Sequence, residues 1–431
     1  LSSAASDVYK RQKKYYEALL ADPGNAQFHL TDPRGASDKS GRTFNNPYQY
    51  FFEQMHMDDA IYADESIYEY PMQQGGGNDG RPYSFGRPSS GGSKAAYPCK
   101  SYGQGRINPA YFYGVFDPND MRRDVSITMT GSNGKGVEKL IPFVPNSKAE
   151  GGGLTLNKWD ENRQANPWVA AQRKSGINGP YMRMSEVYLG YAEVCAALGD
   201  VVTGKQYLKT VRERSFPQGL ANTDAFIASF GNDLVRAIIE ERGFEYAGEG
   251  DRRWTLIRSG YLPEDIKRIK DMTKAMMDGL ATKGYYEFEN GNIISAYIWT
   301  KLVDAKTIYG HRLTAQCPTD KVNDPVLYPG WRGQKDNWEE MGLNYGSSTP
   351  ATNLAIKGLF EIVSEEEAAS LESQGYTKVN WGIDLVDNRD EYDKYLFWDY
   401  DYVSAPIYLW PFTPNVMAAG GFTNGYGFKQ E

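Results

Sequence analysis

The segment YMRMSEVYLGYAEVCAALGD, residues 181–200, has the clearest helical periodicity in this chain. Its apolar side chains recur every three or four residues, which places them along one broad stripe of an α-helix. Gly199 follows the last of them, where a left-handed glycine often ends a helix. Glu186 and Glu193 are close to two helical turns apart, so they project from about the same side. The segment therefore predicts an amphipathic helix that carries two acids.

A second stretch, IIEERGFEYAGEGDRRWTLIRSG at residues 238–260, adds many charges of alternating sign to an apolar stripe. Asn232 or Asp233 stands before it as a helix cap. Charges that leave water persist only when they are paired and hydrogen-bonded. We therefore expect a structural ion-pair network partly folded into the core; the alternative is a solvated helix face with incidental salt bridges. The residues expected in this network are Arg183, Glu186, Glu193, Glu241, Arg242, Glu245, Glu249 and Arg252.

Together these stretches resemble the signature of the SusD/RagB family. In that signature an Arg-x-x-Glu-x-x-Leu-x-x-Ala-Glu helix precedes a Glu-Arg-x-x-Glu-x-x-x-Glu-Gly-x-Arg element, which ends in a Leu-x-Arg-x-Gly turn. The matching residues are Arg183, Glu186, Leu189, Ala192, Glu193, Glu241, Arg242, Glu245, Glu249, Gly250, Arg252, Leu256, Arg258 and Gly260. Weaker likenesses are the strand-like ESIYEYPMQ at residues 65–73 and the DPNDMRR segment at residues 117–123.

The resemblance implies a mainly α fold, a tetratricopeptide-like helical-repeat scaffold with large irregular loop regions and a few short strands. Members of this family are lipid-anchored proteins on the surface of the bacterial outer membrane. They capture glycans without cleaving them and deliver them to a SusC-like TonB-dependent transporter. The resemblance therefore implies a glycan ligand, a transporter partner and no enzymatic activity, with membrane attachment only through an N-terminal lipid anchor missing from this chain. From the motifs we expect no cofactor and no metal.

The chain is expected to form one domain over residues 13–431 that lacks its N-terminal part. Residues 1–12, LSSAASDVYKRQ, look like a non-native leader made of translated sequencing-adapter text. The helical core is expected at about residues 181–280, between loop-rich regions at 27–175 and 285–431 that abound in Gly, Pro and Asn. Outside 181–260 the pattern predicts a helix behind Pro47, a strand at 125–129, a helix after Pro263 and short strands near 285–302.

Composition excludes several other classes of protein. The net charge is −8 and no Lys/Arg run forms a phosphate-binding footprint, which argues against nucleic acid as a partner. Three widely spaced cysteines make neither a disulfide framework nor a metal cluster. No apolar run approaches the roughly 18 residues that span a bilayer.

Aromatic residues are abundant, with 32 Tyr and 9 Trp. Their rings pair an apolar face with a polar edge, which suits the C–H faces and hydroxyls of sugars. Most of them are expected to fill the core, and those in Gly/Pro/Asn-rich loops are the candidates for glycan binding. These candidates are Trp159, Trp168, Tyr83, Tyr97, Tyr102, Trp331 and Trp338.

The sequence is also compatible with other functions. Asp399 and Asp401 alternate onto one strand face, at a separation near the roughly 5–9.5 Å between glycosidase carboxyl groups, so a carbohydrate-active hydrolase is one alternative. A helical-repeat scaffold that binds only protein, or a relative that binds peptides, is another. Asp117, Asn119 and Asp120 fit either a calcium site or a turn with a helix cap.

Overall fold

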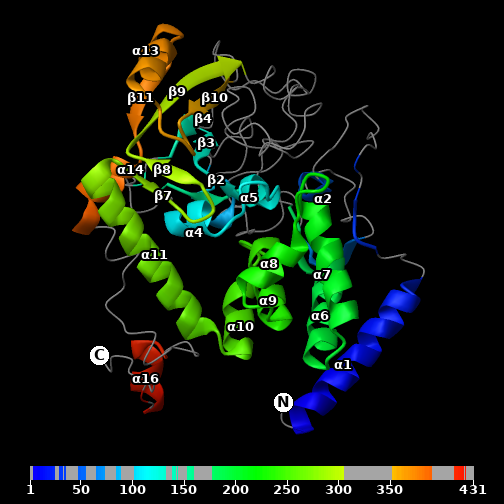
Figure 1. Cartoon of the computed structure of the whole chain (residues 1–431). Coiled ribbons are helices and arrows are strands. Elements are labelled where there is room, and N and C mark those ends of the chain that lie inside the picture. The colour runs from blue at the N-terminus through cyan, green and yellow to red at the C-terminus, as the bar shows by residue number, and fades with distance from the viewer. Residues whose placement is uncertain are drawn as a thin grey trace.

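The computed structural model describes residues 3–24, 29–32, 34, 47–54, 65–72, 84–88, 101–132, 138–141, 143, 153–159, 177–304, 352–390, 412–421 and 423. This part is mainly helical, with most of its short strands above α8–α10 (Figure 1). The predicted mainly α, tetratricopeptide-like class is confirmed. No helix in the described ranges is both long and apolar enough to cross a bilayer.

The helical body consists of six consecutive helices between residues 184 and 283. They are α6 (Met184–Ala197), α7 (Val201–Ser215), α8 (Thr223–Ser229), α9 (Leu234–Glu245), α10 (Asp251–Ser259) and α11 (Leu262–Lys283). Gly199, with φ of +89°, ends α6 as predicted. The side chain of Asp200 then caps α7 and that of Asp233 caps α9, each accepting a backbone N–H from within the first turn.

The contact between α6 and α7 depends on small residues. A Cβ at Gly204 would lie 2.9 Å from the carbonyl oxygen of Ala192, so only glycine allows this approach. Leu189, Leu208 and Ile238 are fully buried and join α6, α7 and α9 in one apolar cluster. Helix pairs packed in this way are the repeating unit of tetratricopeptide-like scaffolds.

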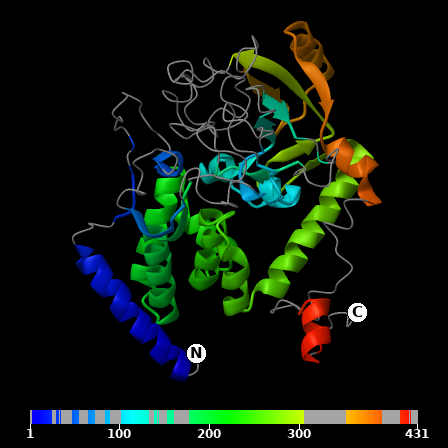
Figure 2. The ribbon, with the colours of Figure 1, turned by 180° about the vertical axis from the view of Figure 1, so that it is seen from behind.

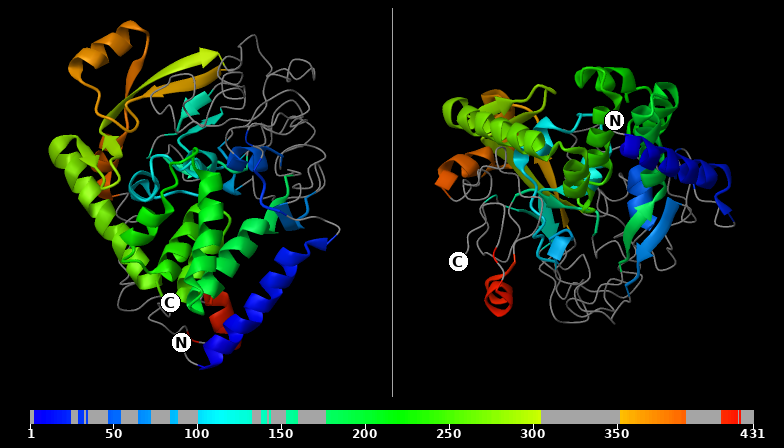
Figure 3. Two further views of the ribbon diagram at one scale, coloured as in Figure 1. Left: turned by 45° about the vertical axis from the view of Figure 1, so that its right-hand side comes forward. Right: turned by 90° about the horizontal axis from the view of Figure 1, so that it is seen from below.

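Helix α1 (Ser3–Ala21) lies against α6 (Figures 1 and 3). Tyr16 meets Gly190, where a Cβ would approach its hydroxyl oxygen to 2.4 Å, and the Tyr191 hydroxyl donates to Glu17 over 3.1 Å. Because α1 includes residues 3–12, the region expected to be non-native is helical here. The assignment of residues 1–12 as a leader, and of 13–431 as one domain, remains a prediction.

The strands pair antiparallel in small sheets within the described part. The pairs are β1 (Ser66–Tyr70) with β6 (Gly179–Arg183), β2 (Ile127–Thr128) with β5 (Thr155–Leu156), β3 (Thr130–Ser132) with β4 (Glu138–Leu140) and β7 (Tyr285–Glu287) with β8 (Ile293–Ser295). A larger sheet has β9 (Tyr297–Asp304) between β10 (Thr352–Lys357) and β11 (Thr377–Asn380).

Two boundaries differ from the sequence prediction. Residues 181–183 form a strand and not the first turn of the helix, because they pair with β1 and Arg183 remains extended at ψ 166°. Val125 belongs to α5 (Arg122–Ser126), so the strand that follows begins at Ile127, where pairing with β5 starts. The helix behind Pro47 is confirmed as α2 (Pro47–Gln54).

The remaining helices cover the upper part of the molecule and the C-terminal region (Figures 1 and 2). They are α4 (Pro109–Gly114), α13 (Glu365–Ser373), α14 (Gly382–Asp387) and α16 (Pro414–Gly420). Phe112, Tyr113 and Trp381 are fully buried in the largest apolar cluster, and the Trp381 indole donates to the Tyr113 hydroxyl over 2.8 Å. This cluster joins α4 and α14 to α11 and to the central strands.

Candidate functional site

Three tyrosines are exposed on the β1–β6 sheet. Tyr68 and Tyr70 are two residues apart on β1 and each exposes 59% of its surface, while Tyr181 on β6 exposes 74%. The rings of Tyr68 and Tyr181 meet edge to face, with 5.8 Å between their centroids. We call Tyr68, Tyr70 and Tyr181 the tyrosine surface. Seen from below, the sheet lies on the opposite side of the molecule from α11 (Figure 3).

Polar side chains hold the edge of this sheet. The Asn178 amide donates to Glu69 over 2.8 Å, and its oxygen accepts the backbone N–H of Met72 at the same distance. These bonds bridge the end of β1 and the residue that precedes β6. They also hold the Asn178 amide beside the carboxylate of Glu69, which lies in the strand that carries Tyr68 and Tyr70, and both groups are able to bond hydroxyl groups.

Charged residues anchor the inner ends of both strands. Arg183, the last residue of β6, is 1% exposed and donates to Glu249 through two hydrogen bonds of 3.0 Å. Glu65, directly before β1, is fully buried and accepts from Arg183 over 3.3 Å and from Arg214 over 2.6 Å. The tyrosine surface is therefore attached to the helical body by buried ion pairs of Arg183, two residues from Tyr181, and of Glu65, three residues from Tyr68.

These pairs belong to one buried cluster. Glu245 accepts from Arg183, Arg214 and Arg122, and Glu249 also accepts from Lys158 over 2.6 Å. We call this cluster the buried brace. Its members are Glu65, Arg122, Lys158, Arg183, Arg214, Glu241, Glu245 and Glu249.

The electrostatics of the brace favour a structural role. Burial would raise the pKa of Glu245, but the charges of Arg183, Arg214 and Arg122 outweigh it and hold this pKa well below its ordinary range. Burial lowers the pKa of Lys158 to about 8, against the opposing effect of Glu249. An acid kept ionised by three guanidinium groups is a poor proton donor near neutral pH.

All eight residues expected in an ion-pair network form ion pairs in the described part. Those outside the brace form separate pairs: Glu186 pairs with Arg242 over 2.9 Å, Glu193 with Arg258, and Arg252 with Glu240 over 2.8 Å. The brace members missed from the sequence were Glu65, Arg122, Lys158 and Arg214. Glu65, Arg122 and Lys158 come from segments outside the signature, and Arg214 lies between its two stretches, so the spacing within the signature did not include them.

Of the seven aromatic residues expected to bind glycan, two lie within the described residues. Tyr83, Tyr97, Trp168, Trp331 and Trp338 lie outside the described residues. Tyr102 is half-buried between its Gly-rich neighbours.

Trp159 requires a correction. Its side chain has no exposed surface and belongs to an apolar cluster with Tyr48, Phe51 and Phe52 of α2 and with Leu156 of β5. In this structure it offers no ring face to a sugar. Glycine-rich sequence before it suggested a loop, but the pairing of β5 with β2 directs this segment into the core.

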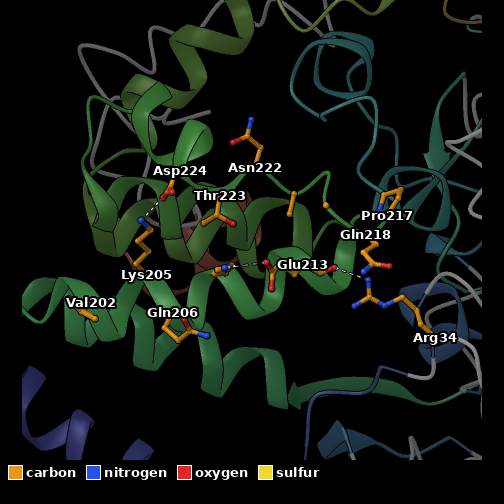
Figure 4. Close-up of a pocket in the computed structure, with 13 residues that line it drawn as sticks. Arg34, Val202, Lys205, Gln206, Glu213, Pro217, Gln218, Asn222, Thr223 and Asp224 are labelled. Atoms are coloured by element: carbon orange, nitrogen blue, oxygen red, sulfur yellow. Dashed lines mark hydrogen bonds and ion pairs between the residues drawn. The ribbon is translucent and has the colours of Figure 1, made fainter.

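A cavity of about 720 Å³ lies between α7 and the loop that leads to α8. Figure 4 shows Lys205, Gln206 and Glu213 on α7, with Thr223 and Asp224 across from them at the start of α8. Lys205 pairs with Asp224 over 2.5 Å. Of the 13 described residues that line it, none is aromatic, so this cavity lacks a ring on which a sugar would stack.

The structure describes the acids considered for a calcium site, but not those considered for catalysis. Asp117 accepts the backbone N–H of Asn119 in a turn, and Asp120 accepts the backbone N–H and two guanidinium N–H groups of Arg122, so its oxygens are used in an ion pair. Within the described ranges, no group of three or more His, Cys, Asp or Glu side chains is placed to hold a metal ion. Asp399 and Asp401 lie outside the described residues.

The sequence matches one known protein family over most of its length. The model of the SusD family matches residues 27–411. The chain belongs to the SusD family.

This SusD-family chain is also similar to individual proteins over part of their length. The SusD-like protein P25 of Formosa agariphila is 28% identical over 160 residues, which are 37% of this chain and 26% of that protein. Among solved structures, the surface glycan-binding protein A of Bacteroides thetaiotaomicron in complex with laminarihexaose is 18% identical, with a TM-score of 0.41 over 61% of this chain and 52% of its own. NanU of Bacteroides fragilis is 17% identical, with a TM-score of 0.38, and the match covers 59% of this chain and 51% of NanU.

The SusD-family chain thus spans about a quarter of its curated relative and about half of these solved structures. The family assignment rests on the family model, which covers residues 27–411 of the 431.

Proposed function

We propose that this chain is a surface glycan-binding protein that captures an oligosaccharide or polysaccharide without cleaving it. The observation that carries the proposal is the tyrosine surface: three exposed rings on one small sheet, held by the buried brace. Large aromatic rings exposed together on a soluble surface commonly mark a binding site. Membership of the SusD family supports the same function.

The proposed contact is stacking combined with hydrogen bonding. The faces of Tyr68 and Tyr181 receive the C–H faces of sugar rings, while tyrosine hydroxyls and neighbouring polar groups bond the sugar hydroxyls. Each contact is weak, and several must act together before affinity exceeds the cost of association. The loop aromatics Tyr83, Tyr97, Tyr102, Trp168, Trp331 and Trp338 remain proposed contributors.

The full-length protein is proposed to sit on the bacterial outer membrane through a lipid anchor and to deliver its glycan to a SusC-like TonB-dependent transporter. Both proposals follow from membership of the family. Tagged full-length protein purified from outer membranes tests them together, because a transporter partner should co-purify with it.

A panel of soluble polysaccharides in native affinity gels tests the binding function, with chromatography of the same mixtures to detect products. Retarded migration on at least one glycan with no new oligosaccharide supports capture. Released oligosaccharide would instead support the hydrolase alternative that uses Asp399 and Asp401. A chain that binds no glycan but retains a transporter or peptides would support a scaffold or a peptide-binding role.

A further inference from the structure

A second cavity adjoins the α7–α8 loop and shares Ala221 and Asn222 with the cavity of Figure 4. It lies where α8, α9 and α11 face the segment that follows α4 (Figure 1), and its volume is about 390 Å³. That volume falls within the roughly 300–1,000 Å³ of small-molecule sites. We call it the inter-helix cavity.

One wall of the inter-helix cavity is aromatic. Phe226, Phe230 and Phe244 line it, with ring centroids 5.3 Å apart for the first pair and 6.2 Å apart for Phe226 and Phe244. The Arg212 guanidinium covers one face of Phe226, 3.7 Å from the ring centroid, but Phe226 and Phe230 are only partly buried, which leaves other ring surface exposed. The cavity of Figure 4 has no such wall.

The same cavity contains hydrogen-bond donors that lack acceptors. The terminal nitrogens of Arg212 donate to Glu241 over 2.6 Å and to the carbonyl of Ala221 over 3.1 Å. Its Nε is buried and has no hydrogen-bond partner among the described residues, and the same holds for Nε of Arg268. Both side chains line the cavity. A buried donor without an acceptor is costly, so these N–H groups favour a ligand with acceptor oxygens.

Acceptors lie at the edge of the cavity. Asp117 and Glu289 line it and are exposed to solvent. The lining carboxylates are Asp117, Asp120, Glu240 and Glu289, and the lining guanidinium groups are Arg212 and Arg268, so four negative and two positive charges leave a formal charge of −2. This balance disfavours an anion, while the orphaned donors disfavour a simple cation.

Hydroxyl groups both donate and accept, and a pyranose adds an apolar C–H face that matches the phenylalanine wall. We infer that the inter-helix cavity binds one neutral sugar ring, as a subsite separate from the tyrosine surface. This inference rests on the proposed function, since it extends glycan binding to a second place on the chain.

Two substitutions on α8 form a matched pair for the test. Ala225 and Ala228 are both exposed on the same helix, but only Ala225 lines the cavity. Ala225→Trp fills the cavity without removing a buried contact, and Ala228→Trp places the same ring outside it. Glu289→Ala removes one acceptor. Circular dichroism checks that each variant keeps the helical content of the wild-type chain.

Titration calorimetry with D-glucose, D-galactose, D-mannose and D-xylose gives the readout, with inorganic phosphate and ethylammonium as charged probes. We expect the wild-type chain to bind at least one pyranose and neither charged probe. Ala225→Trp should weaken pyranose binding by about tenfold or more, Glu289→Ala by a smaller factor, and Ala228→Trp should have no effect.

The inference is overturned if the wild-type chain binds no pyranose, if Ala225→Trp leaves the affinity unchanged, or if ethylammonium binds in place of sugars. Polysaccharide binding in native gels separates this failure from failure of the proposed function. A chain that binds polysaccharide but no pyranose loses only the subsite; a chain that binds neither loses both.

Discussion

Arg183 and Glu249 face each other through two hydrogen bonds of equal length, 3.0 Å from Nε to Oε2 and 3.0 Å from Nη2 to Oε1. This bidentate pair connects the last residue of β6 to the turn between α9 and α10. It is one of the buried contacts that join the tyrosine surface to the helical body, whereas Met182, the preceding residue on the same strand, is exposed.

Replacing Arg183 with Met should destabilise the protein strongly. The change leaves Glu245 and Glu249 buried with fewer compensating charges, and breaking a buried ion pair in this way costs about 3–5 kcal/mol of unfolding free energy. Urea denaturation followed by circular dichroism measures it. Lys267→Met, which breaks the exposed Lys267–Asp271 pair, is the control and should change this free energy by less than about 1 kcal/mol. Equal losses in both variants would mean that the brace is not structural.

Stability should fall steeply in acid. Burial opposes ionisation of Glu245, Glu249 and Glu240, but neighbouring cations lower the pKa of all three below the ordinary 4.5. The unfolded chain therefore binds protons first as pH falls, so the stability these acids contribute is present above about pH 4.5 and is lost below it. Melting temperatures between neutral pH and pH 3 measure this loss. The melting temperature of Arg183→Met should decline less steeply with falling pH, because Arg183 helps to lower the pKa of Glu245 and Glu249. Parallel curves for the two proteins would contradict this role of Arg183.

Lys158 makes stability rise with pH as the acids do, but in the alkaline range. Its pKa is about 8 in the folded protein, because burial outweighs the charge of Glu249, and about 10.5 in the unfolded chain. Between these values the unfolded chain keeps a proton that the folded one has released, so this group makes stability rise with pH. Between about pH 8 and pH 10.5, the unfolding free energy of the wild type should therefore rise relative to that of Lys158→Met.

The other groups that face Lys158 do not obscure this difference. Arg183 remains charged, Glu245 remains ionised, and the pKa of Tyr48 is raised well above its ordinary value by burial. Ionisation of tyrosines in the unfolded chain above about pH 10 lowers stability equally in both proteins. A difference that stays constant from pH 7 to pH 10 would contradict a depressed pKa for Lys158.

Two glycines on either side of Glu249 should differ in tolerance. Gly248 and Gly250 both have positive φ, 82° and 95°, so alanine at either costs about 1–2 kcal/mol of backbone strain. A Cβ at Gly248 would also lie 2.6 Å from a methyl carbon of buried Leu156, whereas Gly250 faces open space. Gly248→Ala should therefore lower the unfolding free energy more than Gly250→Ala. Chemical denaturation of the two variants compares them, and equal effects would show that the Leu156 contact relaxes freely.

The helical body was predictable from sequence because its determinants are local. Apolar spacing located α6, Gly199 ended it, Asp233 capped α9, and the alternating charges of residues 240–252 marked ion pairs. Helix α13 was missed, although Ser364 and Glu367 form a capping box that could have revealed it.

The candidate site was less predictable because exposure depends on tertiary packing. Trp159 follows a glycine run and is buried by α2, while Tyr68 lies in a strand and is exposed. Sequence alternation marked the strand of Tyr68 correctly as β1 but did not show which face meets solvent. Glu65 pairs with Arg183, and Arg214 pairs with Glu245. Glu65 and Arg214 also bond each other across 149 residues of sequence, which is beyond the reach of any local pattern.

The most direct test of the account is the glycan affinity of a Tyr68→Ala/Tyr181→Ala double variant, measured by calorimetry against a polysaccharide that retards the wild-type chain. Tyr15→Ala, which removes a tyrosine 62% exposed on α1, is the matched control. The account predicts that the double variant loses about tenfold or more in affinity, with its melting temperature unchanged, while the control binds as wild type. A double variant that binds the polysaccharide as tightly as wild type would contradict the claim that the brace supports a tyrosine surface for glycan capture.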